Sequence, residues 1–393
     1  MKKATIIKYC TGCGACVSSG EATLEMNPKG FPVAKPKKDS FNLFCNRICF
    51  SSGFQYRGGK PESIWGGIVS SSYAWSTVPE IRRIASSGGT LTALCLYLLD
   101  SGKVDGIVHV QENPDNPIDT ITTCSMTRDE IINHCGSRYS SSSPLLNIFD
   151  YLQTEKKYCF VGKPCDVATM RNLMKTDHRF EESFIILLSF FCAGAPSVNA
   201  NLLLLNKLNT TKEKCISLRY RGDGWPGYAT AIDINGEKHT MDYRSAWRDT
   251  LGRDIRPICR FCLDGIGEHA DVVCFDAWYM DDKKNPMFTE ADGRNGVFCR
   301  TAIGQVIFEE AVNNGYIIVE KSPQLIDNLS YIQRYQFTRR VTMCSTILAM
   351  RVLLKSVPSY PLKYIWHFMK YDKFRSHFSR FRGTIIRVIQ GKI

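Results

Sequence analysis

Residues 87–110, SGGTLTALCLYLLDSGKVDGIVHV, decide the fold of this chain. Apolar side chains after Thr90 recur at helical spacing: Leu91, Leu94, Cys95, Leu98 and Leu99. Gly102 is typical of a helix end, and the run from Val104 to Val110 is typical of a buried strand. A glycine-containing loop, a helix and a strand in this order predict an α/β unit.

The same alternation continues on both sides of this stretch. We expect strands at 68–75, 157–161, 184–191 and 270–278, and a helix at 200–208. Residues 215–245 are typical of antiparallel strands, with Asn235-Gly236 as a hairpin turn. The sequence has no internal repeat. It therefore predicts an α/β fold whose core is a mixed, largely parallel sheet.

The 393 residues favour two or three units, and the sequence divides into three segments. Residues 1–60 are rich in Gly, Pro, Lys and Cys and are too short to build much of a core alone. A link that contains Gly58–Pro61 follows, and residues 61–330 carry the α/β pattern. Residues 331–393 mix basic and apolar side chains at roughly helical spacing, which predicts a basic, amphipathic helical tail.

Three cysteines near the start, Cys10, Cys13 and Cys16, stand in the run CTGCGAC. Thiolates at this C-x2-C-x2-C spacing can converge on one iron–sulfur cluster, which is our preferred interpretation. Structural zinc and unligated thiols are the alternatives. A ferredoxin run would continue to a fourth cysteine, but position 20 is Gly20, so the fourth ligand has to come from elsewhere.

Four other cysteines are candidates to complete the cluster or to build a second one: Cys45, Cys49, Cys259 and Cys262. The chain has 17 cysteines, no secretory signal and no apolar run of about 18 residues, so we expect a reducing cytoplasm. Cys192 ends an apolar strand and is a ligand, a residue that contacts a cofactor, or a core residue. The remaining cysteines are interpreted as small buried or neutral residues: Cys95, Cys124, Cys135, Cys159, Cys215, Cys274, Cys299 and Cys344.

Three glycine-bearing loops follow strand patterns, at 86–90, 136–140 and 162–165. Ligands of open α/β sheets bind beyond the carboxyl ends of strands, and a helix start favours anions. Each loop alone is also compatible with an ordinary turn or helix cap. Together they favour a cofactor that carries phosphate. The candidate cofactor-loop residues are Ser87, Gly88, Gly89, Thr90, Ser137, Tyr139, Gly162 and Cys165.

The net charge of +12 lies in the last sixty residues, where 13 Lys and Arg accompany one acid, Asp372. A basic amphipathic helix can bind an anionic membrane surface. The alternatives are a solvated extension that packs its aromatic face on the core, or an acidic protein partner. We expect no nucleic-acid partner. The expected location is the cytoplasm, or the inner face of the membrane as a peripheral protein.

These motifs together resemble the coenzyme F-420 hydrogenase/dehydrogenase beta-subunit family, including bacterial members encoded with cell-surface polysaccharide genes. The matching segments occur in family order over residues 1 to about 320: Cys10 to Cys16, Ser86 to Thr90 with the helix after it, Val104-Asp105-Gly106, Gly136 to Tyr139, Val161 to Cys165, Cys192-Ala193-Gly194, Gly224-Trp225, Cys259-x2-Cys262, and Ala270-Asp271 to Trp278.

The resemblance implies FAD in the α/β core and one or two 4Fe–4S clusters that feed it. The implied activity is a flavin-dependent oxidoreductase that takes electrons from a ferredoxin-like donor. Its implied substrate is a small molecule or a sugar, with surface polysaccharide synthesis as the implied setting. The alternative is an electron-relay subunit without its own substrate site. Three positions depart from the family pattern: Phe50 after Cys49, Asp166 after Cys165, and Ala193 after Cys192.

Overall fold

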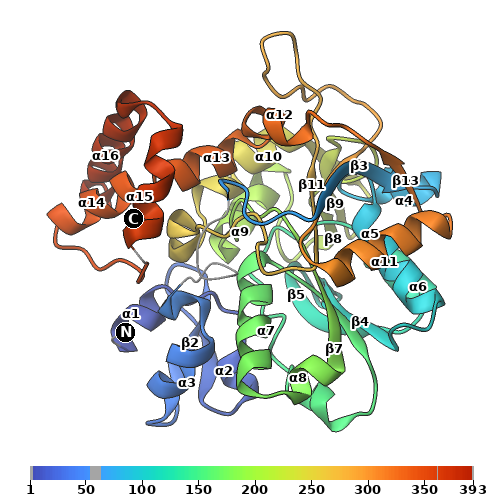
Figure 1. The fold of residues 1–393 in the computed structure, drawn as a ribbon, viewed down its shortest axis with the longest axis horizontal. Coiled ribbons are helices and arrows are strands. Elements are labelled where there is room, and N and C mark those ends of the chain that lie inside the picture. The colour runs from blue at the N-terminus through green and yellow to red at the C-terminus, as the bar shows by residue number, and fades with distance from the viewer. Residues whose placement is uncertain (1–2, 54–62, 361, 392–393) are drawn as a thin grey trace.

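The computed structural model describes residues 3–53, 63–360 and 362–391 (Figure 1). The expected link at 58–61 and the boundary at residue 60 lie outside these residues. A sheet of eight strands forms the centre of the molecule, and its order is β13-β3-β12-β11-β7-β6-β4-β5. Its strands are β3(Ser70–Ser76), β4(Gly106–Asn113), β5(Asn116–Ser125), β6(Tyr158–Gly162), β7(Phe184–Phe190), β11(Val272–Asp276), β12(Asn295–Cys299) and β13(Ile317–Glu320).

The middle of this sheet is parallel, and both of its sides are antiparallel. β4, β6, β7 and β11 run parallel to one another, whereas β5, β12, β3 and β13 join by antiparallel pairing. The α/β class with a mixed sheet is therefore confirmed. The parallel strands are the ones that the sequence pattern predicts best, because strands buried on both faces have nearly continuous apolar runs.

The sequence pattern did not predict three of the outer strands: β5, β12 and β13. β5 is rich in threonine and pairs with β4 as a hairpin that begins after Asn113. β12 begins with Asn295-Gly296, two residue types that are rare in strands. Pairing with β3 and β11 on either side places β12 in the sheet. β12 therefore depends on its neighbours more than on local propensity.

Helices cover both faces of the sheet (Figure 1). α5(Thr90–Asp100) and α11(Ala302–Asn313) pack on one face, where Ile186 and Leu188 of β7 are buried. α7(Pro164–Thr176) packs on the other face, where Leu187 is buried. Alternate residues of one strand thus supply two separate cores, as the two-residue period of a strand requires.

The cysteine-rich N-terminal segment packs beside α7. It contains α1(Lys3–Lys8), α2(Ala15–Ser18), an antiparallel hairpin of β1(Ala22–Met26) and β2(Pro32–Pro36), α3(Phe41–Ile48) and the 3-10 helix η1(Phe50–Ser52). The backbone N–H of Leu145 donates to Cys13 O at 2.8 Å, and Ser143 Oγ donates to Gly12 O at 2.7 Å. The cysteine loop is therefore fixed to the segment that precedes β6.

A second, three-stranded sheet has the order β10-β9-β8. β8(Cys215–Arg219), β9(Tyr228–Asp233) and β10(Lys238–Asp242) are antiparallel, and the turn at Asn235-Gly236 is confirmed. α9(Val198–Lys207) and α10(Tyr243–Arg248) accompany this sheet. Shorter helices connect the remaining elements: α4(Pro79–Ile84), α6(Arg128–Asn133), α8(Arg179–Ser183), η3(Asp150–Gln153), η4(Leu251–Arg253) and η5(Pro257–Phe261).

The C-terminal part is helical, as the sequence predicts. It comprises α12(Leu325–Ile332), α13(Arg334–Val341), α14(Met343–Val352), α15(Leu362–His367), η6(Phe368–Tyr371) and α16(Phe374–Ile389). α13 buries Gln336, Arg339 and Arg340 against the α/β core, whereas α14 to α16 form a group of helices at one side of the molecule (Figure 1). Among the described residues, no helix is both long and apolar enough to span a bilayer.

Candidate iron–sulfur centres

Two cysteines follow neighbouring parallel strands of the central sheet. Cys165 lies in the first turn of α7, just after β6, and Cys192 follows β7. The carboxyl ends of parallel strands meet at one edge of a sheet, where α/β proteins place their ligands. Cys165 and Cys192 therefore reach the same edge, although they are 27 positions apart in the chain.

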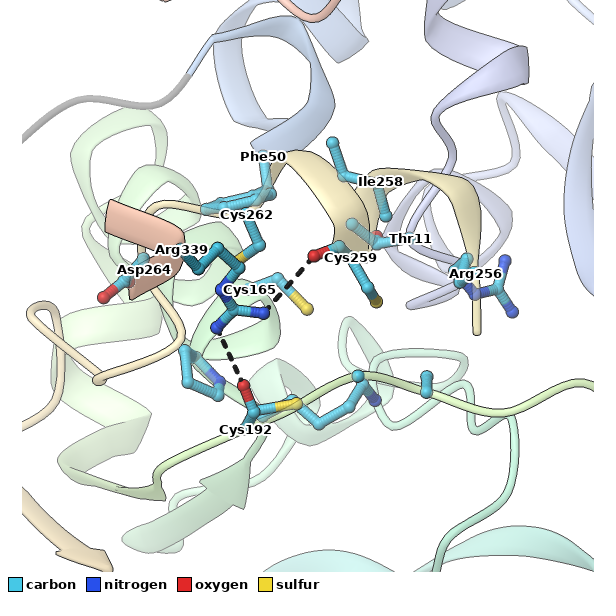
Figure 2. Close-up of a pocket in the computed structure, with 14 residues that line it drawn as sticks. Thr11, Phe50, Cys165, Cys192, Arg256, Ile258, Cys259, Cys262, Asp264 and Arg339 are labelled. Atoms are coloured by element: carbon cyan, nitrogen blue, oxygen red, sulfur yellow. Dashed lines mark hydrogen bonds between the residues drawn. The ribbon is translucent and has the colours of Figure 1, made fainter. Parts of the chain in front are cut away.

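Cys165 and Cys192 line one cavity together with Cys259 and Cys262 (Figure 2). The latter pair comes from η5 and the residue after it. The cavity has about 400 Å³ of empty space, including part that is open to solvent, and Figure 2 shows the four cysteine side chains around a common space. Arg339 of α13 lies beside it and donates to the carbonyl oxygens of Cys192 at 3.1 Å and Cys259 at 3.3 Å. We call these four cysteines the inner cysteine site.

A second cavity of about 430 Å³ lies in the N-terminal segment. It is lined by all five cysteines of that segment: Cys10, Cys13, Cys16, Cys45 and Cys49. Gly12 and Gly14 have φ values of +71° and +94°, a backbone region that glycine enters without a side-chain clash. The loop can therefore turn tightly enough for the three cysteines of CTGCGAC to face one space. We call these five cysteines the outer cysteine site.

The spacing of the thiols fits a cluster better than a single metal ion. Four thiolates around one zinc ion, each about 2.3 Å from the metal, lie within about 4 Å of one another. Among the described residues, the one set with three ligand atoms within 4.8 Å of one another is Asp233, Glu237 and His239 on the β9–β10 hairpin. In neither cysteine site do three thiol sulfurs of the described residues come within 4.8 Å of one another.

Cys45 and Cys49 differ in how their thiols interact with the other three thiols of the outer site. The interaction between the thiols of Cys45 and Cys16 raises the pKa of Cys45 and lowers the pKa of Cys16. Burial raises the pKa of Cys49 to about 12, and its thiol interacts electrostatically with those of Cys10 and Cys16. It also interacts with Cys13. Cys45 also interacts with Cys10 and Cys16, so the interaction with Cys13 is what distinguishes Cys49.

The two cysteine sites adjoin. Thr11 lines both cavities. Cys49 lines the outer cavity and the next residue, Phe50, lines the inner one. α7 contributes Cys165 to the inner cavity and Thr169, one turn later, to the outer cavity.

Burial is the main electrostatic feature of the inner site. It raises the pKa of Cys192 to about 11 and that of Cys262 to about 12, and it raises the pKa of Cys165 as well. Buried thiols without a metal are thus held in the protonated form. Metal ligation needs the thiolate, so loading of this site would release protons.

Lys163 and Asp166 form an ion pair at the N-terminal end of α7. Lys163 Nζ lies 2.7 Å from Asp166 Oδ2 and also donates to Ser142 Oγ at 2.7 Å. Burial alone would lower the pKa of Lys163, but the carboxylate of Asp166 more than offsets this effect, so the pKa is raised. The departure from the family pattern at Asp166 therefore has a structural reason, because the carboxylate keeps a buried lysine charged.

The first glycine loop is tightly packed by the protein itself. A Cβ atom at Gly88 would lie 2.8 Å from Asn295 N and 2.9 Å from Ala74 O. Ser87 Oγ donates to Arg294 O, and Asn295 Oδ1 accepts from Thr90 N, which occupies the start of α5. Ser137 N donates to Ser86 Oγ at 2.6 Å, so the first and second glycine loops touch.

Tyr139 belongs to a buried polar and aromatic group at the carboxyl end of β11. Arg221 pairs with Asp276 at 2.8 Å, and its guanidinium lies over the ring of Tyr243 at 4.4 Å. Burial raises the pKa of Tyr139, and Arg221 opposes this effect. The rings of Trp225 and Trp278 stack at 4.7 Å with an interplanar angle of 6°. Arg221 Nη2 and Trp225 Nε1 are buried without hydrogen-bond partners.

The structure thus divides the residues that the sequence singles out into three places. The outer site holds five of the seven predicted ligands, and the inner site holds Cys259 and Cys262 with Cys165 and Cys192. Gly162 precedes the inner site, and a Cβ there would lie 2.6 Å from Phe160 Cε1. Ser87, Gly88, Gly89, Thr90 and Ser137 form the loop contact, and Tyr139 faces Arg221.

The sequence analysis assigned Cys165 to the cofactor loops and left Cys192 among three interpretations. The available signal was their position, because each directly follows one of two adjacent apolar strands. Arg221, Arg256 and Arg339 were not singled out, since nothing in a local pattern marks an arginine that will be buried.

Comparison with known proteins places these features in a family. Residues 71–150 match the family model for the N-terminal part of the coenzyme F420 hydrogenase/dehydrogenase beta subunit. Residues 155–324 match the model for the C terminus of the same beta subunit. The two matches together cover more than half of the chain.

Several relatives are archaeal. An uncharacterized protein of Methanocaldococcus jannaschii is 24% identical over 352 residues, which cover 80% of this chain and 90% of that protein. The coenzyme F420 hydrogenase subunit beta of Methanosarcina barkeri is 26% identical over 266 residues, which cover 64% of this chain and 81% of that protein.

A solved structure of the F420-reducing [NiFe] hydrogenase complex from Methanosarcina barkeri contains a chain of the same fold. The TM-score is 0.52 at 22% sequence identity, over 72% of this chain and 95% of that one. The order of the sequence motifs, the fold and the two family models agree. This chain belongs to the coenzyme F420 hydrogenase/dehydrogenase beta-subunit family, whose named members are redox subunits of hydrogenases and formate dehydrogenases.

Proposed function

We propose that this protein is an iron–sulfur oxidoreductase that carries electrons through two adjoining 4Fe–4S clusters. The observation that supports this proposal is that nine cysteines line two neighbouring cavities that share Thr11. The proposed ligands of the outer cluster are Cys10, Cys13, Cys16 and Cys49, with Cys45 as a hydrogen-bond donor. Those of the inner cluster are Cys165, Cys192, Cys259 and Cys262.

FAD is the proposed partner of the clusters, because a flavin can accept single electrons one at a time and deliver two of them together as a hydride. Several buried donors fit such a group. Thr90 Oγ1, Arg219 Nε, Arg221 Nη2 and Trp225 Nε1 have no hydrogen-bond partners. Tyr139, Tyr243 and the stacked tryptophans add aromatic surface near Arg221. These residues would hold the phosphates and the ring, and Thr90 would be the residue of the first loop that takes part, since Gly88 is tightly packed by the protein itself.

The proposed electron donor is a ferredoxin-like protein, since single electrons from such a donor suit a cluster near the protein surface. The substrate would be a small molecule or a sugar. A role in surface polysaccharide synthesis rests on the resemblance to family members encoded with such genes. The proposed site of action is the cytoplasm.

Anaerobic purification with iron, sulfide and flavin analysis tests the proposal. We expect a brown-yellow protein with broad absorption near ~400 nm and about eight irons per chain, which correspond to two clusters. Reduction trials with ferredoxin, a deazaflavin and a nicotinamide would then identify the donor. A colourless protein that contains zinc would contradict the proposal.

The second candidate is an electron-relay subunit of a larger complex. It is favoured by the names of the relatives, which are beta subunits of hydrogenases and formate dehydrogenases. Such a subunit would stay reduced until its partner is added. Stopped-flow oxidation with and without candidate partners separates the two functions, because an enzyme with its own substrate site would turn over alone.

We propose further that α16 binds an anionic membrane surface. Its outward face carries Phe374, Phe378 and Ile389 with exposed fractions of 81%, 57% and 75%. Arg375 and Arg382 are exposed on the same helix, and α16 contains no acidic residue. Exposed aromatic and aliphatic side chains beside arginines fit the interface of a bilayer, where each basic residue contributes about 1 kcal/mol.

Vesicles with and without phosphatidylglycerol test this surface on the full chain. We expect binding to anionic vesicles alone, and at least about a tenfold loss with Arg375→Glu and Arg382→Glu, given ~1 kcal/mol per basic residue. Phe374→Ser with Phe378→Ser should also weaken binding. Lys29→Glu with Lys37→Glu, a matched charge reversal at exposed N-terminal positions, should have little effect. Equal binding by all variants would remove the membrane proposal.

A further inference from the structure

Arg256 is a buried arginine that lies between the two cysteine sites. Its exposed fraction is 2%, and it directly precedes η5, which carries Cys259. Its backbone N–H donates to Ala195 O at 2.9 Å, which ties it to the loop after β7. Its Nη1 donates to Cys10 O at 3.2 Å and to Pro32 O at 2.8 Å in the N-terminal segment. One side chain thus joins elements of both sites.

The charge of Arg256 has no acidic partner among the described residues. No carboxylate there lies within 4.0 Å of its guanidinium, and its Nε and Nη2 have no hydrogen-bond partner. Arginine stays protonated inside proteins, and a buried charge without a counter-charge costs several kcal/mol. Two other buried arginines differ, because Arg221 pairs with Asp276 and Arg340 pairs with Glu268, whereas Arg339 resembles Arg256 in having no ion pair with a carboxylate of the described residues.

The guanidinium lies over the ring of Phe31 at 5.1 Å, and cysteine thiols rather than carboxylates interact with its charge. Four of them interact with it electrostatically: Cys10 and Cys13 of the outer site, and Cys165 and Cys259 of the inner site. Arg256 lines the inner cavity (Figure 2). On the other side, a Cβ at Gly12 would lie 2.7 Å from Arg256 Nη2. The glycine inside the CTGC motif therefore leaves the space that the guanidinium fills.

We propose that Arg256 is a positioning residue that provides one fixed positive charge to both clusters and raises the reduction potential of each. This inference rests on the proposed two-cluster function. Thiolate-ligated clusters are anionic and become more so when they accept an electron, so a nearby cation stabilises the reduced state. A charge placed between the clusters acts on both.

Arg339 provides the matched control. It is also buried, and it contacts Cys192 and Cys259 through their carbonyl oxygens. It lines the inner cavity, and its donated hydrogen bonds reach no residue of the outer site. Loss of the Arg339 charge should therefore lower the potential of the inner cluster alone.

The test is a redox titration of the full-length protein, followed by electron paramagnetic resonance of each reduced cluster. We expect Arg256→Met to lower both midpoint potentials and Arg339→Met to lower one. Arg256→Lys, which keeps the charge, should restore most of the shift in both clusters. Iron and sulfide per chain are measured for every variant, so that a lost cluster is not mistaken for a shifted one.

Unchanged potentials in an iron-loaded Arg256→Met protein, or a shift of one cluster alone, would overturn the inference and leave the proposed function intact. A wild-type protein that contains no iron would contradict both the inference and the proposed function. If Arg256→Met and Arg256→Gln lose their iron while Arg256→Lys keeps it, the requirement for charge is supported. Loss of iron from the lysine variant as well would contradict it, because shape rather than charge would then matter.

Discussion

Individual cysteines have different roles in this chain although all seventeen are free thiols. Nine line the two cavities, and the others lie elsewhere in the fold. Cys159 and Cys274, for example, are buried within the central sheet, where a small apolar side chain fits. The environment of each thiol therefore decides whether it can serve as a ligand.

Cys192→Ser tests the inner site. We expect iron to fall from about eight to about four per chain, because one of two cubanes loses a ligand. The signal of the outer cluster should persist. Cys344→Ser on α14, which lines neither cavity, is the control and should retain all iron. An unchanged iron content in Cys192→Ser would argue against ligation by this residue.

Cys49→Ser and Cys45→Ser separate the ligand from the hydrogen-bond donor in the outer site. We expect Cys49→Ser to lose about four irons. Cys45→Ser should keep them but shift the potential of the outer cluster, since hydrogen bonds to ligand sulfurs tune it. Iron analysis and redox titration of both variants decide the matter. Loss of about four irons from Cys45→Ser, with full iron in Cys49→Ser, would instead identify Cys45 as the ligand.

At the scale of elements, the loop that opens α5 depends on close packing against β12. The absence of a side chain at Gly88 lets Asn295 cap α5 and lets Gly88 O accept from Ser76 N at 2.8 Å. The loop that the sequence marks as a cofactor candidate therefore also packs a helix against a strand. This packing requires Gly88 even without a ligand.

Gly88→Ala should destabilise the protein by ~1–3 kcal/mol, because its methyl group would overlap backbone atoms of β3 and β12. Chemical denaturation of the variant and the wild type measures the loss. Gly53→Ala is the control, since the nearest atom to a Cβ there is 3.8 Å away. Equal stability of the two variants would show that the loop can move apart from the sheet.

The β4–β5 hairpin makes folding sensitive to acid. Burial, with a smaller contribution from His134, lowers the pKa of His109 from 6.5 to about 4, and Glu130 opposes this slightly. The unfolded chain therefore takes up a proton first as the pH falls. Stability should decline by up to ~1.4 kcal/mol per pH unit between about 6.5 and 4.

Urea denaturation at pH 7 and pH 5 checks this slope. In His109→Gln, an amide that cannot titrate replaces the imidazole that meets Ser125 Oγ at 2.8 Å. The variant should be less stable than the wild type at pH 7 but should lose less on acidification. An identical pH dependence in both proteins would assign the acid sensitivity to other groups.

At the scale of the whole molecule, the C-terminal helices are part of the inner site. Gln336 and Arg339 of α13 donate to Cys192 O. Tyr360 Oη donates to the carbonyl oxygen of Phe261, next to Cys262, and Tyr9 Oη donates to Ser356 O at 2.6 Å. The first part of the basic tail thus covers the cysteines, and α16 presents the exposed basic face.

Truncation after Gln333 should therefore affect the inner cluster as well as any membrane binding. We expect faster loss of about four irons in air, because solvent and oxygen would reach the inner site. Truncation after Tyr360 keeps α13 and should retain the iron while it removes α16. Equal iron loss from both truncated proteins would contradict the role of α13 as a cover.

The sequence by itself determined the class of the sheet, the cysteine motif and the family, because apolar runs, Gly12 and C-x2-C-x2-C are local patterns. It also singled out Cys259 and Cys262 as candidate ligands. The tertiary structure alone decided that this pair meets Cys165 and Cys192, since only strand order brings the ends of β6 and β7 beside η5. It likewise placed Arg256 between the two sites, where burial gives an ordinary surface residue type a fixed charge without an acidic partner.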